Sequence, residues 1–233
     1  MNIALFGYGK MGKMIECLAV ERGHEIVAKI DVGSGEIDFA KIDVAIDFST
    51  PDAAYENITS CLKNNTPIIS GTTGWLEKFD DVVQFCEEKN GAFIYASNFS
   101  LGVNIFFELN AHLAKMMKNL SQYEVSLEEI HHTQKLDAPS GTAITLAEGI
   151  IANTDYQKWK LDESGYKQIP ITSKRIGDTP GTHTVEYTSE VDSIEIKHTA
   201  QNREGFALGA VVAAEWILGK TGVFTMKDVL NLG

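Results

Sequence analysis

Short apolar runs alternate with amphipathic segments over the first hundred residues of this 233-residue chain, and this alternation constrains the fold more than any other feature. A βαβ alternation of this kind predicts a doubly wound parallel sheet with helices on its faces, a Rossmann-type α/β fold. The predicted strands are residues 2–6, 25–30, 43–48, 67–70 and 92–96, and the predicted helices are residues 11–22, 52–64 and 76–90.

The pattern changes after residue 96, which predicts a second, α+β domain with a mixed sheet. Polar residues at alternate positions of its strands indicate a sheet with one face exposed or at an interface. Residues 154–168 are polar and predict a surface excursion. The predicted strands are residues 123–131, 184–188 and 193–198, and the predicted helices are residues 102–119, 142–153, 205–218 and a short last helix capped by Thr225 and Asp228. We place the domain boundaries at residues 1–98 with 205–233, and 99–204.

Composition narrows the class of protein. A 44% hydrophobic and 22% charged chain is typical of a soluble globular protein, and its net charge of −12 disfavours nucleic acid as a partner. We find no signal peptide and no apolar run of membrane-spanning length, so we expect a cytoplasmic protein without membrane association. Cys17, Cys61 and Cys86 fall in helical patterns and are expected to be reduced, buried thiols.

A glycine motif follows the first predicted strand directly and opens the first helix. Its residues are Gly7, Tyr8, Gly9, Lys10, Met11 and Gly12. In a dinucleotide-binding turn the first glycine permits the bend, the second lets the backbone approach the pyrophosphate, and the third lets helix and strand pack closely. An ordinary tight strand-to-helix turn is the alternative. The position in the fold favours dinucleotide binding.

Asp31 ends the second predicted strand, 19 residues after Gly12. A carboxylate there can accept hydrogen bonds from the ribose hydroxyls and would repel a 2′-phosphate. No arginine follows it, since the next residues are Val32, Gly33 and Ser34. We therefore expect NADH to be preferred over NADPH, with NADPH still usable.

Two further loops leave the same predicted edge of the sheet. Gly71, Thr72 and Thr73 would line the crevice where a doubly wound sheet binds its ligand. A second loop follows the fifth strand, where an Asn amide could meet the nicotinamide carboxamide; its residues are Ala96, Ser97, Asn98 and Phe99. Turn chemistry explains both loops equally well.

The segment from Glu129 to Thr142 contains two imidazoles and an amine within five positions, at His131, His132 and Lys135. If residues 128–135 stay extended, His131 and Lys135 share one face and could act on one ligand. Adjacent histidines on a strand point apart, and we see no cysteine or carboxylate at a useful spacing, so we predict no metal site. Two surface histidines beside a surface lysine are the alternative.

The next residues favour a binding site over that alternative. Ser140, Gly141 and Thr142 lie at a predicted helix start, where hydroxyls and free backbone N–H groups can hold a carboxylate. An ammonium and an imidazole beside such a pocket suit a small acidic substrate and a proton donor.

Several segments together resemble the 4-hydroxy-tetrahydrodipicolinate (dihydrodipicolinate) reductase family. The most specific is His131-His132-x-x-Lys135-x-Asp137-Ala138-Pro139-Ser140-Gly141-Thr142. The resemblance extends to residues 7–12, 71–74, 96–104, 203–210 and 224–230.

The resemblance implies an NAD(P)H-dependent oxidoreductase of diaminopimelate and lysine biosynthesis, in which a hydride goes to C4 of a cyclic dicarboxylate and the 4-hydroxyl leaves as water. It implies that His131 and Lys135 are catalytic and that His132, Gly141 and Thr142 bind substrate carboxylate, with a looser match for Arg175. Which of His131 and Lys135 delivers the proton stays open. The first domain would bind the dinucleotide, and the second would bind substrate and assemble a homotetramer. Residues 32–41 form a shorter loop than in longer members of the family.

Two other functions remain alternatives. One is a related two-domain dehydrogenase of an amino or imino acid, which the His-His-x-x-Lys and Pro-Ser-Gly-Thr pair disfavours. The other is a non-enzymatic NAD(H)-sensing module, which the lack of a basic DNA-reading helix disfavours.

Overall fold

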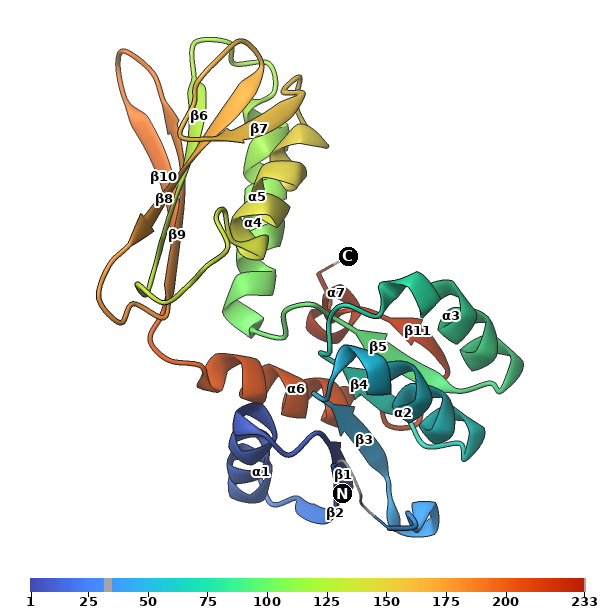
Figure 1. Ribbon diagram of the computed structural model, residues 1–233. Coiled ribbons are helices and arrows are strands. Elements are labelled where there is room, and N and C mark those ends of the chain that lie inside the picture. The colour runs from blue at the N-terminus through green and yellow to red at the C-terminus, as the bar shows by residue number, and fades with distance from the viewer. Residues whose placement is uncertain (32–34, 233) are drawn as a thin grey trace. The chain divides into compact units, whose positions relative to one another are not determined.

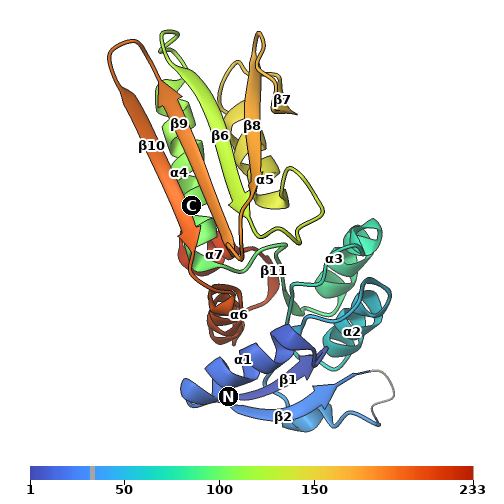
Figure 2. The ribbon, with the colours of Figure 1, turned by 60° about the vertical axis from the view of Figure 1, so that its left-hand side comes forward.

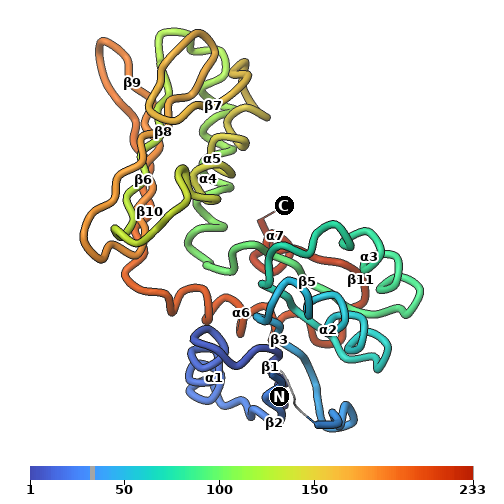
Figure 3. Tube along the Cα trace, viewed as in Figure 1, coloured from blue at the N-terminus to red at the C-terminus, as the bar shows by residue number. Residues whose placement is uncertain are grey.

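The structure of the protein is a computed structural model, and it describes residues 1–31 and 35–232. The chain forms two compact units (Figure 1): unit 1 is Met1–Leu101 with Glu204–Gly233, and unit 2 is Gly102–Arg203. The trace in Figure 3 leaves unit 1 once and returns to it, so that the blue and red parts of the chain fold together. The functional roles assigned to the two parts stay predictions.

Unit 1 contains a six-stranded sheet, and every pair of neighbouring strands in it is parallel. The strand order is β11-β5-β4-β3-β1-β2. It reverses between β1 and β3, so the ligand crevice of a doubly wound fold is expected at their carboxyl ends. The strands are β1 (Asn2–Phe6), β2 (Glu25–Ile30), β3 (Val44–Asp47), β4 (Ile68–Ser70), β5 (Ala92–Tyr95) and β11 (Gly222–Phe224).

Helices cover both faces of this sheet, which confirms the predicted α/β architecture. Helices α1 and α6 share one apolar core with the sheet, and α2 and α3 share another on the opposite face. Close packing of α6 needs a glycine, because a Cβ at Gly209 would lie 1.7 Å from the Phe99 carbonyl oxygen. The helices are α1 (Lys10–Glu21), α2 (Pro51–Lys63), α3 (Phe79–Glu88), α6 (Glu204–Ile217) and α7 (Met226–Leu230), with 3₁₀ turns η1 (Phe39–Lys41) and η2 (Leu76–Lys78).

Unit 2 contains the predicted mixed sheet, in the order β10-β9-β6-β8-β7. Strand β6 pairs antiparallel with β9 and parallel with β8. Helices α4 and α5 cover one face (Figure 2), and alternate residues of β6, such as Val125 and Leu127, point into that core. The elements are α4 (Leu101–Met117), β6 (Glu124–His131), α5 (Gly141–Ile151), β7 (Lys158–Leu161), β8 (Gln168–Arg175), β9 (Gly181–Thr188) and β10 (Ser193–Ala200).

Four details of the fold differ from the sequence-based predictions. Residues 154–168 contain strand β7, and β8 and β11 were not predicted at all. Strand β8 carries Pro170, which lacks a backbone donor and disfavours a strand assignment, while β11 has only three residues. The strand of the signature ends at His131, so residues 132–135 are not extended. Cys17 is exposed, whereas Cys61 and Cys86 are buried.

The cap predicted for the last helix is confirmed, since the Thr225 backbone N–H donates to Asp228 Oδ2 at 2.7 Å. Within the described part of the chain, we find no helix that combines the length and apolar character needed to cross a membrane.

Candidate active site

The glycine turn of unit 1 has the geometry that a dinucleotide-binding turn requires. Gly7 has φ +86°, and a Cβ there would lie 2.2 Å from the Phe48 carbonyl oxygen. A Cβ at Gly12 would lie 2.3 Å from the Gly7 carbonyl oxygen, so the third glycine allows the helix to approach the turn. A Cβ at Gly9 would meet nothing within 4 Å, which leaves space for a ligand where α1 begins. The described residues therefore fit a pyrophosphate at this helix start.

The other residues of the glycine motif have different surroundings. The Tyr8 hydroxyl contacts Glu16 and accepts from Lys29 Nζ at 3.0 Å, so its ring is held at the side of α1. Lys10 is exposed, and Met11 packs against the core of unit 1. Asp31 follows β2 directly and is exposed, as a ribose-binding carboxylate should be. Residues 32–34, whose lack of an arginine entered the cofactor prediction, lie outside the described residues.

A buried carboxylate, Asp47, organises the loops beside the glycine turn. It ends β3 with no exposed surface and accepts from the hydroxyls of Ser49, Ser70 and Thr72 at 2.6–2.8 Å. The Thr72 hydroxyl also accepts from the Ser49 backbone N–H at 2.9 Å, so it fixes the loop from inside. Thr73 is exposed, and a Cβ at Gly71 would lie 2.3 Å from the Phe48 ring. Of the two hydroxyls in this loop, Thr73 is the one placed to meet a ligand.

Some side chains of the loop after β5 also have structural contacts. The Asn98 Oδ1 accepts from the Ser100 backbone N–H at 2.9 Å, and the Phe99 ring is buried in the core against Phe48. Ala96 is half-buried and Ser97 is exposed. The Phe99 side chain serves packing, so of this residue only the backbone could contact a cofactor.

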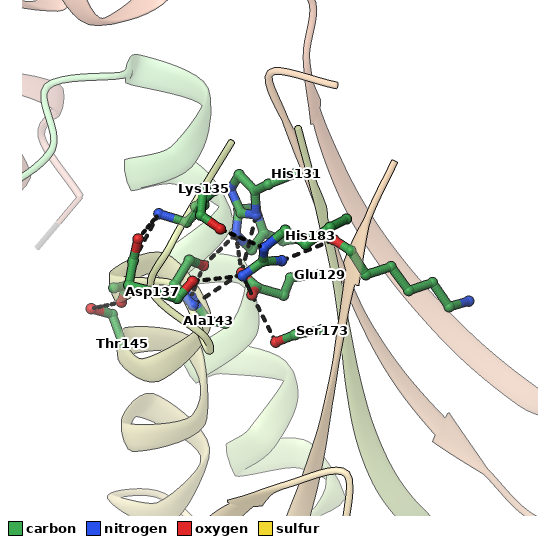
Figure 4. Close-up of polar contacts among 12 residues, drawn as sticks. Glu129, His131, Lys135, Asp137, Ala143, Thr145, Ser173 and His183 are labelled. Atoms are coloured by element: carbon green, nitrogen blue, oxygen red, sulfur yellow. Dashed lines mark hydrogen bonds and ion pairs between the residues drawn. The ribbon is translucent and has the colours of Figure 1, made fainter. Parts of the chain in front are cut away.

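The signature of unit 2 builds a cluster of polar side chains around one buried carboxylate, Glu129 (Figure 4). Its Oε1 accepts from the Ser173 hydroxyl at 2.8 Å and from Arg175 at 3.1 Å. Its Oε2 accepts from the Ser140 backbone N–H at 3.1 Å and lies 3.2 Å from His131 Nδ1. Burial raises the pKa of Glu129, but the donors His131, Ser140, Ser173 and Arg175 outweigh burial and hold this pKa well below its usual range. Glu129 is therefore an anion at neutral pH.

His183, from β9, is a second buried imidazole of this cluster. Its Nε2 lies 3.0 Å from the Ser140 hydroxyl and 3.7 Å from Glu129 Oε2, and its ring lies edge-on to that of His131. Burial, with the nearby charge of His131, lowers the pKa of His183 to about 4. The ring is therefore neutral at neutral pH, and it shares a hydrogen bond with the Ser140 hydroxyl beside Glu129.

The lowered pKa of His183 makes stability depend on pH in a defined direction. The unfolded chain binds a proton at this residue below about pH 6.5, whereas the folded protein does so only near pH 4, so stability falls as pH drops through that window. Between pH 7.5 and 5 we expect a loss of about 2 kcal/mol from this residue. Urea unfolding should show that His183→Asn removes most of this slope, whereas His112→Asn, at an exposed histidine of α4, should keep it. An unchanged slope in His183→Asn would contradict the assignment.

Lys135 lies in a turn after β6, because its backbone N–H donates to the His132 carbonyl. Its Nζ contacts both carboxylate oxygens of Asp137 at 2.8 Å, and that ion pair lowers the pKa of Asp137. The prediction that strand alternation brings His131 and Lys135 to one face is therefore wrong, because the strand ends at His131. Arg175 connects them instead, since it donates to the carbonyl oxygens of Lys135 and Asp137 and to the carboxylate that contacts His131.

The start of α5 has the helix cap and the free backbone N–H groups that the sequence predicted. Ser140 is the N-cap, and its hydroxyl accepts from the Ala143 backbone N–H at 3.2 Å. Gly141 and Thr142 form the first turn, ahead of the first intrahelical bond, which Ile144 makes to Ser140. A Cβ at Gly141 would meet nothing within 4 Å, so this end of the helix is open to a ligand. His132 is half-buried at the end of β6.

Glu129, His131 and His183 bring three possible metal ligands within 4.8 Å of one another. The reason given for predicting no metal, the lack of a usefully spaced carboxylate, was therefore wrong, because Glu129 lies two residues before His131 on the same face. The arrangement nevertheless suits a hydrogen-bonded network better than a cation site. The positive guanidinium of Arg175 already lies 3.1 Å from the carboxylate, and Ser173 and Ser140 use its other lone pairs.

Sequence reasoning missed Glu129, His183 and Ser173 as members of the site, and used Ser140 only as part of a motif. Glu129 could have been found from the alternation of β6, which places it beside His131. His183 and Ser173 had no local signal, because they enter the cluster only through the pairing of β6 with β9 and β8.

Comparison with known proteins assigns the chain to a family. Residues 1–99 match the model of the dihydrodipicolinate reductase N-terminus, and residues 102–230 match that of its C-terminus. The chain belongs to the dihydrodipicolinate reductase family. It is 57% identical to a 4-hydroxy-tetrahydrodipicolinate reductase of Christiangramia forsetii and 38% identical to one of Thermosipho africanus, in each case over 99% of this chain and 98% of the relative.

A solved structure supports the same fold. The dipicolinate-bound dihydrodipicolinate reductase of Paenisporosarcina sp. TG-14 aligns with a TM-score of 0.78 over 97% of each chain, at 24% sequence identity. This family resemblance, predicted from the residues of the signature, is confirmed.

Proposed function

We propose that this chain catalyses the NAD(P)H-dependent reduction of 4-hydroxy-tetrahydrodipicolinate to tetrahydrodipicolinate, with loss of water, in diaminopimelate and lysine biosynthesis. The observation that carries the proposal is the combination, in one small cluster of unit 2, of an imidazole on a buried carboxylate and an open helix start. The imidazole can donate or accept a proton, and the helix start can bind an anion. Relatives that share most of their length with this chain are reductases of this substrate by name.

The roles of the residues follow from their positions. The backbone N–H groups of Gly141 and Thr142, with His132 nearby in the sequence, would bind a ring carboxylate. Lys135, now paired with Asp137, would meet another acidic group or a developing charge as an ammonium. His131 and Lys135 are the two groups that could move a proton to the departing 4-hydroxyl. These assignments are proposals.

The cofactor would be held by unit 1. The space beside Gly9 and the N-terminus of α1 would take the pyrophosphate, and Asp31 the ribose, with Thr73 and the loop of residues 96–99 at the nicotinamide end. Reduced nicotinamide, when bound, supplies a hydride to ring C4. The chain's own contribution is to orient the ring, exclude water and provide the proton, so that the hydroxyl leaves as water.

A coupled assay tests this function. Aspartate semialdehyde and pyruvate are condensed enzymatically, and NADH or NADPH consumption is followed after this protein is added. Turnover supports the proposal. No turnover with either nicotinamide would overturn it, and turnover of an amino or imino acid instead would favour a related dehydrogenase.

A preference for NADH is part of the proposal and has its own test. The Asp31 carboxylate should disfavour a 2′-phosphate by about 1 kcal/mol, or roughly fivefold in KM. Asp31→Asn should narrow the ratio of the NADPH and NADH Michaelis constants, whereas Glu36→Gln, at an exposed acidic residue farther along the same loop, should leave it unchanged. A lower KM for NADPH in the wild type would contradict the preference. The homotetramer and the cytoplasmic location also stay predictions.

A further inference from the structure

One buried carboxylate contacts several polar groups of the proposed site of unit 2. Glu129 has no exposed surface, and its partners come from four elements: His131 on β6, Ser140 at the start of α5, Ser173 and Arg175 on β8, and His183 on β9. Glu129 itself does not face a ligand, so its effect must pass through these partners.

The contact with His131 fixes one nitrogen of a ring that is only 8% exposed. Nδ1 lies 3.2 Å from Glu129 Oε2 in a geometry that falls short of a hydrogen bond, and no other described residue accepts from this buried nitrogen. The other nitrogen, Nε2, lies beside Gly181, where an added Cβ would approach it to 3.1 Å. A carboxylate at Nδ1 favours a proton on that nitrogen, which leaves Nε2 as the one that exchanges a proton with a ligand.

The contact with Ser140 fixes the anion-binding turn. The Ser140 backbone N–H donates to the same oxygen, Oε2, at 3.1 Å, directly before the open N–H groups of Gly141 and Thr142. Ser173 and Arg175 hold the other oxygen, so the carboxylate cannot rotate freely. Arg175 also ties down the loop that carries Lys135.

We propose that Glu129 is a positioning residue that holds His131 with Nδ1 protonated and, through the same oxygen, locks the α5 start, so that the proton-handling and carboxylate-binding groups share one anchor. The catalytic consequence of this inference rests on the proposed function. The effect of Glu129 on the tautomer of His131 and on the start of α5 does not depend on it. Glu129 serves the reaction through His131 and Ser140 and contacts no substrate.

The test combines kinetics, binding and nitrogen NMR on the full chain. In Glu129→Gln we expect kcat to fall at least about tenfold and the Kd of dipicolinate, a planar cyclic dicarboxylate, to rise several-fold, with the Kd of NADH unchanged. Glu148→Gln, at an exposed residue of α5, should alter none of these. ¹⁵N spectra of labelled histidines, assigned with His131→Asn, should show neutral His131 of the wild type protonated on Nδ1, and a shift towards the Nε2-protonated form in Glu129→Gln.

The outcomes separate the two claims. A wild-type protein without reductase activity would overturn the proposed function, while the tautomer of His131 would still decide the role of Glu129. If neutral wild-type His131 carries its proton on Nε2, the inference is wrong, even if the variant does not fold. Unchanged kcat and histidine spectra in Glu129→Gln would also overturn it, as would an equal weakening of dipicolinate and NADH binding.

Discussion

Lys135→Ala is expected to lower kcat by about 100-fold or more while the Kd of NADH stays unchanged. Proton donation by a placed side chain contributes on this order, and Lys135 belongs to unit 2, whereas the glycine turn belongs to unit 1. Its ammonium pairs with Asp137, a carboxylate 62% exposed, which we expect an acidic ligand to be able to replace. The measurement is steady-state kinetics of the reduction, with NADH binding followed by fluorescence.

The kinetic pattern distinguishes catalysis from structure. If Lys135 acts only in the transition state, kcat and kcat/KM should fall together, and if it only binds the ground state, KM should rise at constant kcat. Lys160→Ala, which removes an exposed lysine paired with Glu163, should change neither. Equal losses of kcat and of NADH affinity in Lys135→Ala would mean that Lys135 is structural.

The sequence was informative where function and folding use local patterns. The glycine turn could be predicted because both of its contacts, Gly7 with Phe48 and Gly12 with Gly7, follow from a strand that bends into a helix. The α5 start could be predicted because a cap and its free N–H groups are consecutive residues. The strands and helices that form the core of unit 1 could be predicted, because their apolar residues recur with a clear strand or helix periodicity.

The sequence was less informative where an element depends on distant partners. Strand β8 has a weak strand pattern with a proline, and its place between β6 and β7 comes from pairing with both. The extension assumed for residues 132–135 failed because a local backbone hydrogen bond turns the chain there: the Lys135 N–H donates to the His132 carbonyl. The Glu129 network has the same origin, since no local pattern shows that β9 and β8 bring His183 and Ser173 to one carboxylate.

The largest effects in unit 1 should come from Gly9 and Gly12, and they should differ in kind. Gly9→Ala is expected to raise the Kd of NADH at least about tenfold, because the methyl group would enter the open space where a pyrophosphate approaches the backbone. Its effect on folding should be small, about 1 kcal/mol or less, since Gly9 has φ −80° and a helix N-cap tolerates alanine at modest cost.

Gly12→Ala should act mainly on stability. Alanine favours a helix over glycine by about 1 kcal/mol, but its Cβ would lie 2.3 Å from the Gly7 carbonyl oxygen, a backbone atom that cannot move aside as a flexible side chain could. Overpacking of this kind costs about 2–3 kcal/mol net, which lowers Tm by about 5–10 °C for a chain of this size. Thermal unfolding and NADH titration of both variants, well below Tm, separate the two effects. If Gly9→Ala lowers Tm as much as Gly12→Ala and binds NADH normally, the turn is a folding element only, and the dinucleotide lies elsewhere.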